Sequence, residues 1–261
     1  IEYNNNASHQ VPDADDVPTA EIWLDASAGS IREATICSNT IQATYSPNGA
    51  NIRIIGQPKE ANAKVGMIAI SGNLIGSQWD NIHISAAQGV TISGNTVYSG
   101  HHRNLLMEDC SQMVVGNNSF GHNADYGVAK ELCTGVTFRN CRDSVFTGNV
   151  LQDCQSGRHL FPTAPELQRE ALLELYDCRN MILSSNQILD SAPYGIRLAN
   201  CVDMTINSTV VTDRRTPPLQ KSAVYWTGAI GRSMITASTL GPCTEKTFVS
   251  EEQPLLANNF T

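Results

Sequence analysis

The sequence has few aromatic residues, few charged residues and no long apolar run. Phe, Trp and Tyr make up 6% of the 261 residues, and Asp, Glu, Lys and Arg make up 16%. No stretch approaches the roughly 18 apolar residues of a membrane-spanning helix, so we expect no membrane partner. Hydrophobic residues still amount to 41%. The chain can therefore bury a core, but it must build that core from aliphatic side chains.

Two other absences narrow the function. The chain has no excess of basic residues, because its formal net charge is −8. This charge argues against nucleic acid as a partner, although a local basic groove could still attract an anionic polymer. The eight cysteines and six histidines show no CxxC or HxxxH spacing. We therefore expect no metal site and no cofactor.

A repeated octapeptide dominates what is present. In VTISGNTV (90–97), apolar and polar residues alternate, break at Gly-Asn and then alternate again, which predicts two short strands joined by a corner. Related stretches place a polar residue at the same corner position, and successive corners lie 21 to 37 residues apart. The corner residues are Asn39, Asn73, Asn95, Asn118, Asn149, Asn186, Thr209, Ser238 and Asn259. Variable insertions over a fixed minimum indicate stacked units with loops on one face.

A second column precedes the first. Cys110, Cys141, Cys178 and Cys201 each lie eight residues before a corner residue, and Ala87 holds the same place before Asn95. Each unit is then a coil of three short strands, and the chain is a parallel β-solenoid. The column cysteines should point inward as free, buried thiols. The corner asparagines should form a ladder of side-chain amides on coils about 4.8 Å apart.

These xIxxC-xxVxIxGNxI units resemble the right-handed parallel β-helix, or pectin-lyase-like, superfamily over residues 21–261. The resemblance implies an all-β fold, but it carries over no catalytic residue. We expect residues 1–19 to be a polar N-terminal segment or linker and residues 20–261 to be the β-helix domain, as part of a longer chain. We also expect an extracellular or periplasmic location.

The strand that ends at the column cysteine presents a chemically rich outer face. Alternation from the inward cysteines predicts the outward pairs His83/Ser85, Leu106/Glu108, Thr137/Arg139, Glu174/Tyr176 and Arg197/Ala199. In the next coil the register leaves Tyr225 or Trp226 outward. The insertions lead into this strand and hold four of the six histidines. Loops over a rigid strand platform commonly carry binding groups. A solvated face of paired opposite charges is the competing interpretation.

A trough of carboxylates, arginines and aromatic rings suits a polysaccharide or oligosaccharide. The candidate catalytic residues are His102, Glu108, Asp125, Arg139 and Glu174. The candidate substrate-binding residues are Arg103, His122, Tyr126, Tyr176, Tyr194, Arg197 and Trp226.

Two reactions fit these candidates. In a glycoside hydrolase, Glu108 and Glu174, with Cα atoms about 9.6 Å apart by strand spacing, would be the acid and base of an inverting pair. Asp125 could replace either one. In a polysaccharide lyase, Arg139 or Arg197 would neutralise a uronate, and His102, Tyr126 or Tyr176 would abstract the proton. Calcium is disfavoured because the outward positions of this strand carry no Asp. The alternative class is a non-catalytic glycan binder, adhesin or tailspike-like module, and an oligomer is compatible with either class.

Overall fold

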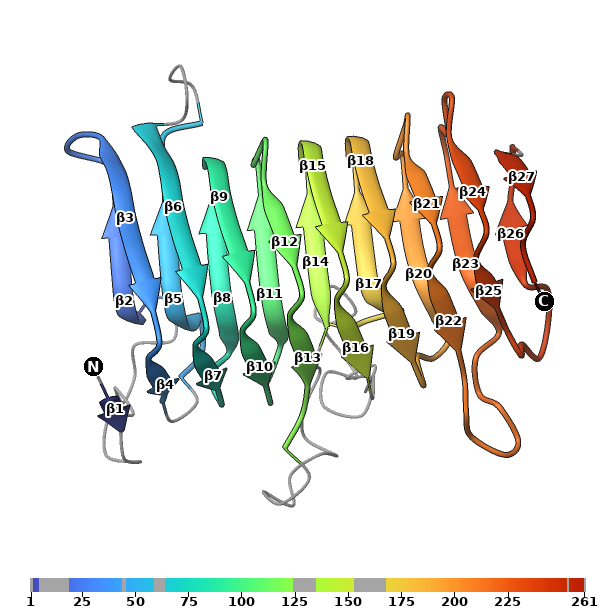
Figure 1. Cartoon of the computed structure of the whole chain (residues 1–261), viewed down its shortest axis with the longest axis horizontal. Helices are drawn as coiled ribbons and strands as arrows, with labels where there is room; N and C mark the ends of the chain where they lie inside the picture. Colours follow the sequence, from blue (N-terminus) through green and yellow to red (C-terminus); the bar gives the residue numbers. More distant parts are fainter. Residues whose placement is uncertain are drawn as a thin grey trace.

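The chain folds into a solenoid of parallel strands (Figure 1). The computed structural model describes residues 2–4, 19–43, 46–58, 64–123, 135–152, 168–252 and 254–260. Within these ranges the strands form three parallel sheets of nine strands each, and there is no α-helix. No helix in the described part of the chain is long and apolar enough to cross a membrane. Each coil contributes one strand to each sheet, so the predicted three-strand coil is confirmed.

Sheet A follows the Asn corner and consists of β1 (Glu2–Asn4), β4 (Thr40–Gln42), β7 (Leu74–Gly76), β10 (Thr96–Tyr98), β13 (Ser119–Gly121), β16 (Val150–Gln152), β19 (Gln187–Leu189), β22 (Val210–Thr212) and β25 (Thr239–Leu240). Sheet B precedes the cysteine column and consists of β2 (Thr19–Asp25), β5 (Gly49–Ile55), β8 (Asp80–Ser85), β11 (Arg103–Glu108), β14 (Val136–Arg139), β17 (Ala171–Tyr176), β20 (Tyr194–Ala199), β23 (Ser222–Thr227) and β26 (Phe248–Ser250). Sheet C joins the two and consists of β3 (Ile31–Cys37), β6 (Val65–Ser71), β9 (Gln88–Ser93), β12 (Val114–Gly116), β15 (Arg142–Thr147), β18 (Arg179–Ser184), β21 (Thr205–Asn207), β24 (Met234–Thr236) and β27 (Leu255–Ala257).

The core consists of side chains stacked in files along the solenoid axis. One file runs through sheet C and includes Ile70, Ile92, Val115 and Phe146, all buried and paired from strand to strand. Burying an aliphatic side chain of this size stabilises the fold by about 1.5–3 kcal/mol. Because each file repeats the same kind of residue, alternation within short strands is enough to build a continuous core. In the N-terminal segment, β1 pairs with β4 and extends sheet A.

The predicted asparagine ladder is present. From Asn39 to Asn186, each side-chain amide donates to the Oδ1 of the next asparagine at 2.9–3.2 Å. The same Oδ1 atoms accept the backbone N–H of the preceding rung. The left-handed conformation that the corner needs is taken by the residue before each rung, for example Asn117 and Ser185, and not by the rung itself.

Replacing Asn149 with Ala should lower the free energy of unfolding by about 1–3 kcal/mol, because groups of its two neighbouring rungs would be left buried without their partner. Asn149 is fully buried and bonds Asn118, Asn186 and the Val115 carbonyl. Denaturant unfolding of the variant measures the loss. Asn207→Ala, on the half-buried outer side of β21, is the matched control. An equal loss in both variants would contradict a structural role for the ladder.

The cysteine column is also as predicted. Cys110, Cys141, Cys178 and Cys201 are buried and free. Hydrogen bonding to the Cys141 thiol and burial raise the pKa of Cys178 to about 12. The Cys178 thiol is therefore protonated and unreactive at neutral pH. Off the column, Cys37 is exposed and Cys243 is half-buried, while Cys133 and Cys154 lie outside the described residues.

A second, shorter ladder was not predicted. Asn51 donates to Asn81 at 2.9 Å, and Asn81 donates to Asn104 at 2.8 Å, at the start of the sheet B strands. Each amide also binds a carbonyl at the end of a sheet A strand, such as that of Tyr98. This ladder fixes the bend at which β5, β8 and β11 begin. It thereby sets the register of the face described next.

Candidate functional site

The outer face of sheet B carries the residues that alternation predicted, in the predicted register. His83 pairs with Leu106, Leu106 with Thr137, Thr137 with Glu174, and Glu174 with Arg197. The parallel column contains Ser85, Glu108, Arg139, Tyr176 and Ala199. These two columns define the platform of the site.

The predicted position of Trp226 needs a correction. It is fully buried among the core residues, so it cannot line the platform as predicted. The outward aromatic residue of β23 is Tyr225, which pairs with Arg197. The alternation of AVYWTG fitted either register. Val224 and Trp226 point inward because Val224 continues the file of Ile196.

The centre of the platform is a charge cluster around Glu108. Its Oε2 lies 3.1 Å from His83 Nε2, and its Oε1 accepts from Arg139 at 3.3 Å. The His83 ring also contacts Arg53 through Nδ1 at 2.8 Å. Glu108 remains accessible, with 27% of its side chain exposed, and 43% of the Arg139 side chain is exposed. A ligand on the platform can therefore reach both groups.

The hydrogen bonds define the protonation of this cluster. Arginine can only donate, so Nδ1 of His83 must accept from Arg53, and the ring proton sits on Nε2, directed at Glu108. The hydrogen bond from His83 lowers the pKa of the Glu108 carboxyl below its usual range, and Arg139 acts in the same direction against the effect of burial. Glu108 is thus ionised at neutral pH and suits a base or a stabiliser of positive charge.

Glu174 has a different environment. Only 4% of it is exposed, because Arg169 lies over it and bonds its Oε2 at 3.1 Å. Its Oε1 accepts the backbone N–H of Glu170 at 2.8 Å. Arg169 also bonds Thr137 Oγ1 and the carbonyl of His102. Glu174 therefore anchors the return of the chain onto the platform.

The separation expected between Glu108 and Glu174 needs a correction. The two residues occupy different columns, since Glu108 pairs with Arg139 whereas Glu174 pairs with Thr137. Two strand spacings combined with two residues along the strand place their Cα atoms about 12 Å apart, not 9.6 Å. Arg139, which lies on the strand between these two residues, contacts Glu108.

His102 and Arg103 belong to a buried group beside the platform. Arg103 lies 3.6 Å from Asp80 and 2.8 Å from Nδ1 of His102, and the His102 ring packs on Trp79 at 4.7 Å. Burial lowers the pKa of Arg103 to about 10, with Asp80 opposing it, so Arg103 stays charged. Both predicted site residues are buried in this arrangement and support the loop from which β11 begins.

The far end of the platform is aromatic. The rings of Tyr194 and Tyr225 stack at 4.2 Å, and the guanidinium of Arg197 lies 5.1 Å from the centre of the Tyr225 ring. Arg197 also pairs with Glu170. Tyr176 lies under Arg139 at 6.0 Å, and burial raises its pKa to about 12. Tyr176 therefore keeps its proton at neutral pH.

The remaining predicted residues follow β13 in the sequence. His122 is half-buried directly after β13, while Asp125 and Tyr126 lie outside the described residues. No group of three or more His, Cys, Asp or Glu side chains in the described ranges is arranged to hold a metal ion.

Sequence reasoning omitted three groups from the candidate set. Arg53 and His83 come from NIRII and NIHIS, two matching stretches in which an outward base follows the Asn–Ile pair. This repeat was a usable signal. No such signal exists for Arg169, because this residue lies at the end of a long insertion that does not follow the repeat.

Comparison with known proteins assigns the chain to a family. The model of the right-handed beta helix region matches residues 20–168, more than half of the chain, so the chain belongs to this family. The predicted right-handed parallel β-helix is confirmed. No curated protein shows significant sequence similarity to the chain.

Two solved structures share the fold. Full-length tailspike protein 2 from the Escherichia coli O157:H7 bacteriophage CAB120 is 11% identical, with a TM-score of 0.61 over 95% of this chain and 33% of that one. The enzymatically active domain of tailspike protein 2 from bacteriophage CBA120 is 10% identical, with a TM-score of 0.59 over 95% of this chain and 36% of that one. This chain therefore spans about a third of the length of these proteins.

Proposed function

We propose that this protein binds a polysaccharide along the outer face of sheet B and cleaves it at Glu108. The observation that carries the proposal is the accessible carboxylate of Glu108, held between His83 and Arg139 at 3.1 and 3.3 Å. A fixed, ionised carboxylate held by a histidine and a cation is typical of a catalytic site. Rigid strands hold all three groups, which favours catalysis over a merely solvated face.

The path of the sugar chain follows the solenoid axis. Tyr225 lies four strand spacings from Glu108 through β14, β17 and β20, about 19 Å along the axis. Aromatic faces stack on the apolar faces of sugar rings, so the Tyr194–Tyr225 pair would hold the chain at one end. Arg139 and Arg197 would bind hydroxyl or carboxylate groups between the two ends.

Two reactions remain candidates. Hydrolysis commonly needs two carboxyl groups, and Glu108 would require a partner such as Asp125, because Glu174 is bonded to Arg169. Elimination from a uronate needs a cation next to the substrate carboxylate and one base. The 43% exposure of Arg139 beside the ionised Glu108 supports this second reaction. We propose a polysaccharide lyase or a glycoside hydrolase, with Glu108 as the reacting group in either case.

One structural neighbour is the enzymatically active domain of a tailspike protein, which supports an enzyme rather than a passive module. An extracellular or periplasmic location is part of the same proposal, since polysaccharide substrates are found there.

Incubating the protein with a panel of neutral and acidic polysaccharides tests the proposal. New reducing ends without ultraviolet absorbance indicate hydrolysis, and reducing ends with the absorbance of an unsaturated uronate indicate elimination. Glycan binding with no product on any substrate would leave the non-catalytic binder as the function. If the protein shows no glycan binding and forms no product, the proposal is contradicted entirely.

Tyr225→Ala should weaken polysaccharide binding about tenfold or more and raise KM, with kcat little changed, because the stacked ring is lost far from Glu108. Steady-state kinetics and glycan binding measure the effect. Leu219→Ala, an exposed apolar residue outside the platform, is the control. An unchanged KM would place the bound chain elsewhere.

A further inference from the structure

The outer face of sheet B carries an exposed tryptophan at the end opposite to the Tyr194–Tyr225 pair. Trp23 lies on β2, the first strand of this sheet, and 44% of it is exposed. Ten large hydrophobic residues are exposed in the described part of the chain, and Trp23 is the only one of them on a sheet B strand. An exposed apolar side chain is common by itself, so the position of this ring decides its meaning.

Trp23 stands in the same outward column as part of the platform. It pairs with Arg53, Arg53 pairs with His83, and the column continues from strand to strand as far as Tyr225. Trp23 lies three strand spacings, about 14 Å along the axis, from the level of Glu108, and Tyr225 lies about 19 Å away on the other side. Glu108 is therefore flanked by aromatic positions in both directions.

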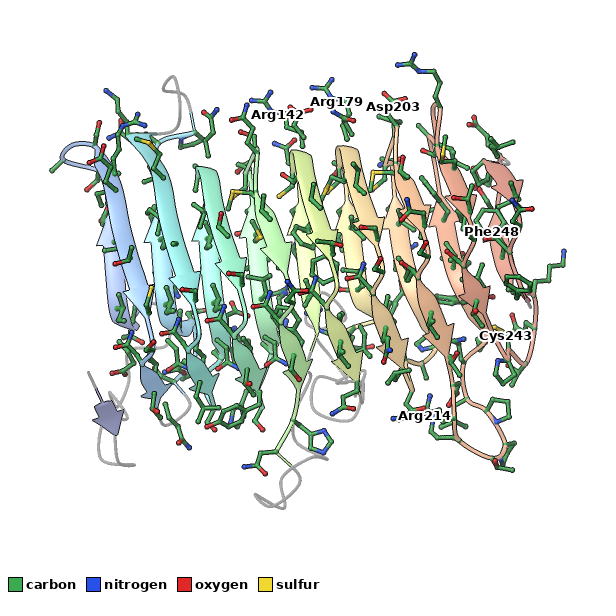
Figure 2. All side chains as sticks on the ribbon, in the orientation of Figure 1. Arg142, Arg179, Asp203, Arg214, Cys243 and Phe248 are labelled. Carbon is green, nitrogen blue, oxygen red and sulfur yellow. The ribbon has the colours of Figure 1, made fainter. Side chains whose placement is uncertain are left out.

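The aromatic part of this face ends at Tyr225. On β26, the last strand of sheet B, Phe248 (Figure 2) packs against the core, and Val249 takes the outward position beside Tyr225. Trp23 and Tyr225 thus mark the two ends of the surface on which a chain lying along the axis can stack.

A series of side-chain contacts holds the Trp23 ring and connects it to the reacting group. The Arg53 guanidinium lies 5.8 Å from the centre of the Trp23 ring. Arg53 also bonds the Asn48 carbonyl and Nδ1 of His83, and Nε2 of His83 contacts Glu108. Because Arg53 is only 6% exposed, it supports the ring from within the structure while nearly half of the ring surface stays in water. A ring fixed in this way is prepared for stacking.

The second outward column connects Trp23 to Glu108 by accessible positions. Asp25 follows Trp23 on the outer face of β2, and the residues paired from Asp25 onward are Ile55, Ser85 and Glu108. Asp25 is exposed, and Ile55 and Ser85 are half-buried, so a ligand can contact each of them. The Asp25 carboxylate can accept hydrogen bonds from hydroxyl groups next to the ring.

We infer that Trp23 forms a second sugar-binding subsite, on the opposite side of Glu108 from the Tyr194–Tyr225 pair. The ligand is a pyranose ring of a polysaccharide, because its apolar C–H face can stack on the indole while its hydroxyl groups bond Asp25. The relation to Glu108 rests on the proposed function, whereas the stacking needs no catalysis. A bound chain that contacts both aromatic positions extends past Glu108 in both directions, so cleavage falls within the chain and not at its end.

Acrylamide quenching of tryptophan fluorescence tests the subsite without depending on catalysis. The probes are the neutral and acidic polysaccharides of the panel, polygalacturonate, alginate, xylan and dextran among them. The chain has three tryptophans, of which Trp226 is fully buried and Trp79 is half-buried, so quenching reports mainly on Trp23. We expect a polysaccharide that binds to protect Trp23 in wild type and in Glu108→Gln. Trp23→Ala should bind it about tenfold or more weakly.

Two variants separate stacking from folding. Phe260→Ala removes another exposed aromatic ring, outside sheet B, and should bind like wild type. Trp23→Tyr keeps a ring at the subsite and should retain most of the binding that Trp23→Ala loses. Circular dichroism shows whether each variant folds.

The outcomes distinguish the subsite from the proposed function. A polysaccharide that binds without protecting Trp23, and with equal affinity for Trp23→Ala, would overturn the subsite and leave the proposed function standing. Protection of Trp23 with no product would support the subsite and contradict cleavage. If no polysaccharide of the panel binds, both are overturned. Where product forms, the first products should be long fragments, and release of single sugars from the start would overturn the placement of subsites on both sides of Glu108.

Discussion

Glu108→Gln is expected to lower turnover by about 10²-fold or more while leaving the fold intact, because general acid–base groups contribute roughly 10²–10⁴ to rate. Glutamine keeps the shape and can still accept from Arg139, but it cannot take up a proton. Stability should change by no more than about 1 kcal/mol, since Glu108 takes part in a partly exposed ion pair. The measurement is kcat on the polysaccharide identified by the panel.

Arg139→Ala separates the two chemistries. If the reaction is elimination, this change should reduce turnover more than Glu108→Gln, because the cation next to the uronate is lost. If the reaction is hydrolysis, Glu108→Gln should be the more damaging change. The hydrogen bond that lowers the pKa of Glu108 should also let wild-type activity persist at acid pH, until this carboxylate gains its proton. Full activity of both variants would place the active site elsewhere.

The largest effect on stability is expected from Glu174→Gln. It should lower the free energy of unfolding by about 3–5 kcal/mol, because the change breaks the buried ion pair between Arg169 and Glu174 by removing the charge of one member. Arg169 is 1% exposed and joins Thr137, Glu174 and the His102 carbonyl. Denaturant unfolding of the variant measures the loss.

Glu108→Gln is the control for the same chemical change at an accessible position. The double variant Arg169→Leu/Glu174→Leu replaces both members of this buried ion pair with apolar residues, so it should lose less stability than Glu174→Gln. A Glu174→Gln variant that is as stable as wild type but inactive would restore Glu174 as a catalytic candidate.

The fold could be predicted because it repeats. A single octapeptide is weak evidence, but nine corners in one frame fix the coil, the ladder from Asn39 to Asn186 and the inward direction of Cys110 and Cys141. The same alternation then places Glu108, Arg139 and Glu174 outward. It fails at AVYWTG, where two registers bury an aromatic residue equally well. Only the pairing of Val224 with Ile196 and of Trp226 with Leu198 shows that Trp226 points inward.

The environment of the site was less predictable. Alternation gives the direction of a side chain but not what covers it, so the burial of Glu174 under Arg169 could not be foreseen. The covering residue ends an insertion, and insertions do not obey the repeat. The contact of His83 with Glu108 has a similar cause, since it joins neighbouring coils through long side chains whose reach the pattern does not encode.

The stacking of coils also fixes distances along the solenoid axis. The distance from Glu108 to the stacked rings of Tyr194 and Tyr225 is set by the number of strands between them and by no loop. Changes within a loop can alter what borders the platform, but they leave that distance untouched. It can change only by the gain or loss of a whole coil, in increments of about 4.8 Å. Under the proposed function, the length of polysaccharide that spans from the Tyr194–Tyr225 pair to Glu108 would therefore change only by whole coils.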